Sequence, residues 1–113
     1  MAAIAPLLPH GQANDPAVEF VEEIGGIYFR SIRLAKAGMF VPQHKHDHDH
    51  ATFCGNGAAR AWADNEWIGD VEQGHAIEIR AGRQHTFMAL TDNTLLCCVH
   101  DVASALSIKE RGL

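Results

Sequence analysis

The sequence has no cluster of basic residues and no long apolar run. Its 113 residues include 9 Lys and Arg against 14 Asp and Glu, which gives a formal net charge of −5 with histidine neutral. Because nucleic acids are bound largely through Lys and Arg contacts to phosphates, this balance argues against a nucleic-acid partner. No apolar stretch approaches the ~20 residues that span a bilayer, so no membrane partner is expected.

Cysteine is also scarce. There are three cysteines, and Cys97 and Cys98 are neighbours that would point to opposite faces of a strand. A disulfide between them is therefore not expected, and the odd number indicates a reducing compartment. The apolar start of the chain, 1–9, has no basic flank and is interrupted by Pro6 and Pro9, unlike a secretion signal. These features predict a cytoplasmic protein.

The length is that of one domain. Residues 1–15 predict an extended N-terminal tail, and residues 16–113 predict a single folded domain. In this domain, short segments of apolar and β-branched residues are separated by turn residues roughly every ten positions, which is typical of an all-β sandwich or barrel. The predicted strands are 18–24, 27–34, 58–63, 66–71, 76–80, 85–90 and 94–100.

Asp64-Asn65 has the composition of a tight hairpin turn between segments 58–63 and 66–71. A hairpin there would pair Trp62 with Trp67 across its two strands.

Segment 94–100 is unusual because residues 95–99 are apolar without alternation. Both of its faces are therefore expected to be buried. A small barrel has one interior, so another sheet, a C-terminal helix or a second subunit must cover the second face. Asp101 or Ser104 is a candidate cap for a short helix that runs through Lys109. We expect a homodimer whose contact includes this strand or the N-terminal tail.

Histidine, by contrast, is abundant. There are eight, and four of them fall in the run His44-Lys45-His46-Asp47-His48-Asp49-His50. Such a run is compatible with a solvated loop or with a low-complexity tract that binds metal loosely. In a strand, however, His44 and His46 project from the same face. His50 joins them if the chain reverses before it and returns through Thr52 and Phe53, because paired strands approach to ~4.5–5.5 Å. Three imidazoles would then form a metal site, with His48 at the reversal pointing away.

A second segment adds to this pattern. A glycine, Gly74, precedes a predicted strand, a glycine turn and His85. Together the two segments resemble the two signature motifs of the cupin superfamily. In the first motif Gly38, His44, His46 and Gly57 match, and His50 stands where the family usually has glutamate. In the second Gly74, Gly82 and His85 match, while Arg80 replaces a proline and Ala89 an asparagine.

The resemblance implies a cupin-type jelly-roll β-barrel, commonly dimeric, that holds one divalent transition metal ion between its sheets. It implies that His44, His46, His50 and His85 are the metal ligands. An imidazole shell suits Fe, Mn, Ni, Cu or Zn and disfavours Mg and Ca. The residues proposed to line a substrate pocket are Phe87, which shares a face with His85, together with His100 and Cys54.

The predicted function is metal-dependent chemistry on a small organic molecule bound inside the barrel. A dioxygenase-like oxidoreductase is favoured by analogy with small single-domain cupins, and an isomerase or lyase is an alternative. A non-catalytic cupin that binds a metal or small ligand, as a sensor or accessory protein, is the competing interpretation. No paired carboxylates and no evident nucleophile are visible, so the sequence identifies no catalytic residue.

Overall fold

The structure is a computed structural model that describes residues 9, 17–41 and 49–101. In these ranges the chain is all β and contains no helix, and so none that could cross a membrane. The predicted helix ending near Lys109 lies outside the described residues, as does nearly all of the predicted tail. The strands are β1 (Ala17–Ile24), β2 (Ile27–Leu34), β3 (His50–Asn56), β4 (Ala58–Ala63), β5 (Glu66–Glu72), β6 (Ala76–Ile79), β7 (His85–Ala89) and β8 (Thr94–Asp101).

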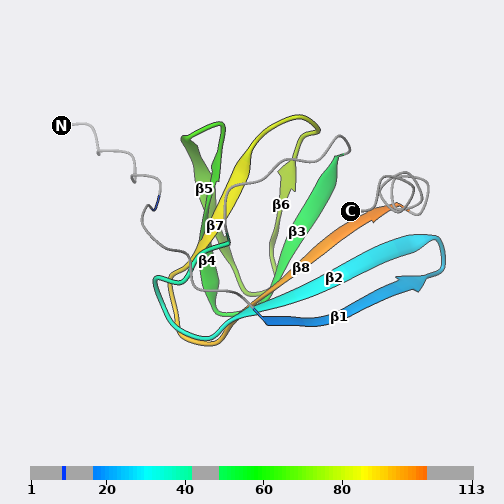
Figure 1. The fold of residues 1–113 in the computed structure, drawn as a ribbon, viewed down its shortest axis with the longest axis horizontal. Coiled ribbons are helices and arrows are strands. Elements are labelled where there is room, and N and C mark those ends of the chain that lie inside the picture. The colour runs from blue at the N-terminus through cyan, green and yellow to red at the C-terminus, as the bar shows by residue number, and fades with distance from the viewer. Residues whose placement is uncertain (1–8, 10–16, 42–48, 102–113) are drawn as a thin grey trace.

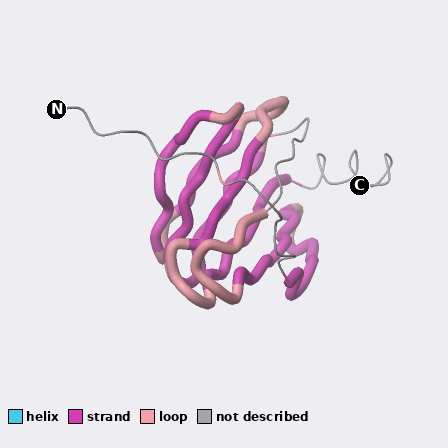
Figure 2. The backbone as a smooth tube through the Cα atoms, turned by 60° about the vertical axis from the view of Figure 1, so that its left-hand side comes forward, coloured by secondary structure: helices cyan, strands magenta, loops and turns pink. Residues whose placement is uncertain are grey.

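The strands form two antiparallel sheets that face each other (Figures 1 and 2). The larger sheet has the order β1-β2-β8-β3-β6 and the smaller sheet the order β5-β4-β7. Because alternate residues of a strand point to one side, each sheet contributes one apolar face to a shared core. The core residues are Leu34, Cys54, Ile79 and Leu96 from the larger sheet, Ala59, Ala61, Val71, Phe87 and Ala89 from the smaller sheet, and Val41 from a connection.

The chain passes from the larger to the smaller sheet through Gly57, the single residue between β3 and β4. Its φ of +77° lies in the left-handed region that glycine adopts without strain. The turn between β5 and β6 lies against this corner. The Gln73 N–H donates to the Gly57 carbonyl at 3.0 Å, and the Gly74 N–H donates to the Cys54 carbonyl at 2.9 Å. These hydrogen bonds tie the two crossings together.

The hairpin between β4 and β5 confirms the predicted turn. Asp64 and Asn65 have φ values of +50° and +68°, the two positive values that a type I′ turn requires. Trp62 pairs with Trp67 as expected. Trp62 is buried, whereas Trp67 is exposed.

Strand β8 lies between β2 and β3 in the larger sheet. Thr94 and Leu96 on its inner face are buried, as predicted. On its outer face Leu95, Cys97 and Val99 are only half-buried, and the neighbouring Phe53, which pairs with Cys97, is exposed. Cys98 and His100 on the inner face are also half-buried, so the prediction that both faces are buried is met only in part on either face.

Candidate metal centre

Two histidines meet between the sheets. His50 is the first residue of β3 in the larger sheet, and His85 is the first residue of β7 in the smaller sheet. Only 5% of His50 and 1% of His85 is exposed, and their ring centroids lie 4.9 Å apart. The two opposed sheets thus bring residues 35 positions apart in the sequence into contact in the interior.

The strand period explains why both imidazoles point inward. In β3, His50 shares its face with the buried Thr52 and Cys54, whereas Phe53 between them is exposed. In β7, His85 shares its face with Phe87, whose ring meets the imidazole edge-on at a centroid distance of 5.9 Å. Phe87 therefore forms an apolar wall beside His85.

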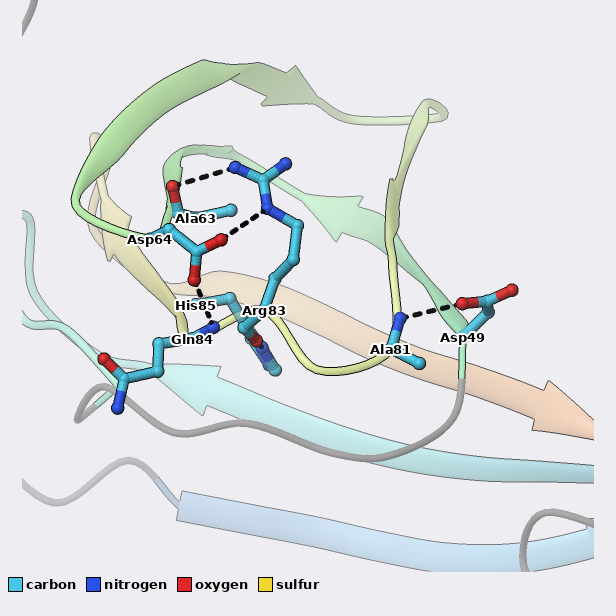
Figure 3. A network of polar contacts seen from close by, with 7 residues as sticks. All are labelled: Asp49, Ala63, Asp64, Ala81, Arg83, Gln84 and His85. Carbon is cyan, nitrogen blue, oxygen red and sulfur yellow. Dashed lines mark hydrogen bonds and ion pairs between the residues drawn. The ribbon is translucent and has the colours of Figure 1, made fainter.

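The segment before His85 is held by a single carboxylate from the β4–β5 turn (Figure 3). Asp64 Oδ2 accepts a hydrogen bond from Arg83 Nε at 3.0 Å, and Asp64 Oδ1 accepts one from the Gln84 N–H at 3.0 Å. The guanidinium also donates to the Ala63 carbonyl through Nη2 at 3.1 Å. Both residues that immediately precede His85 are therefore fixed to the end of β4.

A second carboxylate holds the same loop from the opposite sheet. Asp49, which precedes His50, accepts a hydrogen bond from the Ala81 N–H at 2.8 Å through Oδ1 (Figure 3). Ala81 lies in the turn that leads from β6 to His85. The start of β3 and the start of β7 are thus linked through one loop, which couples the positions of the two imidazoles.

The backbone also selects a tautomer for His85. Its Nδ1 lies 3.4 Å from the Arg83 carbonyl oxygen. A carbonyl only accepts, so this hydrogen bond places the hydrogen on Nδ1 and leaves the lone pair on Nε2. Metal-bound histidines commonly have this tautomer, in which one ring N–H is held by a protein acceptor and the other nitrogen bears the lone pair that binds the ion.

The two imidazoles fit a divalent transition metal ion, because ions such as those of Fe, Ni, Cu and Zn bind imidazole nitrogen well. Two buried imidazoles supply part of a shell, although the described ranges contain no complete group of three or more His, Cys, Asp or Glu residues arranged around a metal. His44 and His46, the other two predicted ligands, lie outside those ranges, as does His48. The four-histidine ligand set therefore stays a prediction.

The other predicted pocket residues lie at different depths. The half-buried His100 ring stacks on Tyr28, with centroids 4.6 Å apart. Cys54 is fully buried in the core, where its thiol donates to the carbonyls of Asn56 at 3.3 Å and Gly57 at 3.4 Å. Burial raises the pKa of Cys54, so the thiol is favoured over the thiolate. Contacts of Phe87, His100 or Cys54 with a substrate remain predictions.

Asp49 and Asp64 position the site, but nothing in the sequence singles them out. Both fall in predicted turns, which would by itself account for their polarity. Their partners, Ala81 and Arg83 with Gln84, lie 32 residues from Asp49 and 19 to 20 residues from Asp64. Patterns of neighbouring residues in the sequence do not predict contacts between residues this far apart.

Comparison with known protein families and with curated proteins gives no match. Solved structures, in contrast, are similar to this chain. A "Cupin 2 conserved barrel domain protein" from Leptotrichia buccalis matches with a TM-score of 0.66 and 16% identity over 81% of this chain and 43% of its own length. KdgF from Halomonas sp. matches with a TM-score of 0.61 and 16% identity over 74% of this chain and 75% of its own.

An oxalate oxidase structure matches with a TM-score of 0.56 and 17% identity over 66% of this chain and 40% of its own. This chain therefore spans less than half the length of the Leptotrichia protein and of the oxalate oxidase. At identities this low the similarity establishes the fold alone. The chain has the cupin fold, as its two sequence motifs predict.

Proposed function

We propose that this chain is a metal-binding cupin that uses one divalent transition metal ion in the chemistry of a small organic molecule. The observation that carries the proposal is the meeting of two buried imidazoles, 4.9 Å apart, from opposite sheets. The proposed ligands are His44, His46, His50 and His85. The proposed metals are Fe, Mn, Ni, Cu and Zn, which accept imidazole shells.

A bound transition metal supplies a Lewis-acidic centre that polarises a group of the small molecule. The chain's own residues supply position and surroundings. The Arg83 carbonyl orients His85, Asp64 holds the residues before it, and Asp49 links the loop to His50. Phe87 keeps one side of His85 apolar.

Dioxygenase-like oxidation is the first candidate reaction. The structurally similar oxalate oxidase bears the name of an enzyme that oxidises a small organic acid, which supports an oxidoreductase. An isomerase or lyase needs a general base, and the inward-facing side chains of β3 and β7 include no carboxylate and no imidazole other than those of the two proposed ligands. The same observation favours the second candidate function, a cupin that binds a metal or a small ligand without catalysis. These inward-facing residues are His50, Thr52, Cys54, His85, Phe87 and Ala89.

Oxygen uptake distinguishes the two functions. The iron-loaded protein is expected to consume oxygen with at least one of a diketone, a thiol or a phenol, and His85→Ala is expected to reduce uptake to the level without protein. An oxygen electrode measures both. If the iron form turns over none of these compounds while it binds metal, the dioxygenase assignment is wrong and the non-catalytic function is favoured.

We also propose that a second copy of the chain covers the outer face of β8. Phe53 is 41% exposed there, beside the half-buried Cys97 and Val99. Burying such a face contributes about 25 cal/mol per Å² of apolar surface.

Sedimentation equilibrium at micromolar concentrations is expected to give a dimer for the parent and a weaker dimer for Phe53→Gln. The control is Trp67→Gln, because Trp67 is similarly exposed, at 43%, but lies in the other sheet. A monomeric parent would contradict the proposal.

A further inference from the structure

Polar side chains from three strands share the inner face of the larger sheet beside His50. In β2, Tyr28 and Arg30 alternate with the outward-facing residues and share a face with the buried Ile32 and Leu34. Tyr28 pairs with His100 and Arg30 with Cys98. On the other side of β8, Cys98 pairs with Thr52 of β3. Arg30, Cys98 and Thr52 thus form one row across the sheet.

The neighbouring row of residues contains His50, one of the proposed metal ligands. The β3–β8 register pairs Ala51 with Val99 and Thr52 with Cys98, which places His50 level with His100. His100 in turn pairs with and stacks on Tyr28. The second row is therefore Tyr28, His100 and His50, and it lies directly beside the row that contains Arg30.

Arg30 is the only positive charge in these two rows, and it is exposed. The side chains of Lys36, Arg60, Arg80 and Arg83 each make an ion pair with a carboxylate. Arg30 makes no such pair with any carboxylate of the described part of the chain. On the same face the register places one described carboxylate near this group, that of Glu23, which pairs with Tyr28 in the neighbouring row. The chain as a whole carries a formal charge of −5, so Arg30 is a positive group in an acidic protein.

Arg30 lies opposite the Cys98 thiol in the pairing of β2 with β8. Burial raises the pKa of Cys98, while its hydrogen bond to Thr52 and the charge of Arg30 act to lower it. The thiol lies 3.5 Å from Thr52 Oγ1 on the inner face. The strand pairing that sets Arg30 opposite Cys98 agrees with this effect of its charge.

The spacing between Arg30 and His50 is that of a small molecule. Arg30 lies two strands away from His50 and two residues further along the sheet. With ~4.8 Å between strands and ~3.3 Å per residue, their α-carbons are about 12 Å apart. Both residues lie on the same face of the sheet, and a separation of this size is one that a small molecule can span together with the two side chains.

We propose that Arg30 binds a carboxylate, and that the small molecule in the barrel is a carboxylic acid whose other end reaches the metal. The guanidinium presents two parallel N–H donors to the two oxygens of a carboxylate. The stacked rings of Tyr28 and His100 form a flat wall along the adjacent row, against which the carbon skeleton packs. The inference rests on the proposed function for the role of the metal, whereas the anion site itself requires only Arg30 and its neighbours.

The test uses malonate as the probe and malonamide as its uncharged counterpart. Protein stripped of metal with EDTA is titrated with each, and the amide shifts of residues near Arg30 and Cys98 are followed by NMR. Malonate is expected to bind and malonamide is not. Arg30→Met is expected to weaken malonate binding about ten-fold or more, and Arg30→Lys by less, because lysine keeps the charge but loses the paired donors.

Arg33→Met is the matched control. It removes one positive charge from the same strand, but Arg33 alternates with Ile32 and Leu34 and so lies on the outer face. Its malonate affinity is expected to equal that of the parent. Malonate binding that is absent in the parent, or unchanged in Arg30→Met, would overturn the inference. Loss of malonate binding in Arg30→Met, together with a parent that retains no metal, would support the anion site while the proposed metal function failed.

Discussion

Replacement of His85 by alanine is expected to strip the metal from the protein. His85 is 1% exposed and the backbone holds its Nδ1, so no other side chain takes its place when it is removed. His50→Ala is expected to weaken binding without abolishing it, with water filling the position. Metal analysis after dialysis measures both. His75→Ala is the control, because His75 is exposed on the turn before β6. Equal metal content in His85→Ala and the parent would contradict the proposed site.

The same measurement extends to the histidines that lie outside the described residues. His44→Ala and His46→Ala are expected to lose the metal, and His48→Ala is expected to keep it. The expectation depends on a chain reversal between His46 and His50. If His48→Ala lost the metal and His50→Ala retained it, the reversal would be in the wrong place.

The carboxylate of Asp64 is expected to affect metal binding through position alone. Asp64→Gly removes the contacts to Arg83 and Gln84 but keeps the turn, because glycine accepts the φ of +50° without strain. Metal affinity, measured by competition with a chelator, is expected to fall by up to about ten-fold. Asn65→Gly, in the same turn, is the control. An equal loss of affinity in both variants would show that the turn, and not the carboxylate, matters.

The strands were predictable because their signals are local. The apolar period and the flanking turn residues predict β2 and β4 at their observed bounds, and the Asp64-Asn65 pair predicts the hairpin and its tryptophan pair. The order of strands in each sheet is not local, and it was not predicted; the resemblance of the two motifs to the cupin superfamily implied only a jelly-roll β-barrel. That resemblance also led to the pairing of His50 with His85 across the two sheets, which the structure brings together.

Contacts between side chains far apart in the sequence were not predictable in this way. Asp64 meets Arg83 only because the end of β4 pairs with the start of β7, where Ala63 lies opposite His85. Arg30 carried no signal in the sequence at all. Arg30 becomes a candidate binding residue only through the register of β2, β8 and β3, which places it on the same face as His50. The sequence thus predicts the scaffold and the histidines, while the residues around them emerge from strand register.

The largest expected loss of stability follows from Gly57→Ala. A Cβ at this corner would overlap Thr91 Oγ1 and would lie 2.9 Å from Thr94 Oγ1. These hydroxyls bond to each other at 2.9 Å, Thr94 Oγ1 donates to the Ala58 carbonyl at 3.2 Å, and the Ala58 N–H donates to Thr91 Oγ1 at 3.3 Å. The network joins the crossing between the sheets to the β7–β8 turn, and Thr94 is fully buried. An added methyl group therefore disturbs a network of hydrogen bonds whose central residue, Thr94, is buried.

Two costs add at Gly57, and a second glycine separates them. At Gly74 the φ of +87° is also positive, but a Cβ there would meet nothing within 4 Å. Gly74→Ala therefore carries only the left-handed backbone cost of about 1–2 kcal/mol, whereas Gly57→Ala adds an overpacking cost of about 1–3 kcal/mol. We expect Gly57→Ala to lower the free energy of unfolding by about 2–5 kcal/mol, measured by urea denaturation with all proteins at one concentration. If the two variants unfolded at the same urea concentration, the contacts with Thr91 and Thr94 would not constrain this corner, and the backbone conformation alone would explain the glycine.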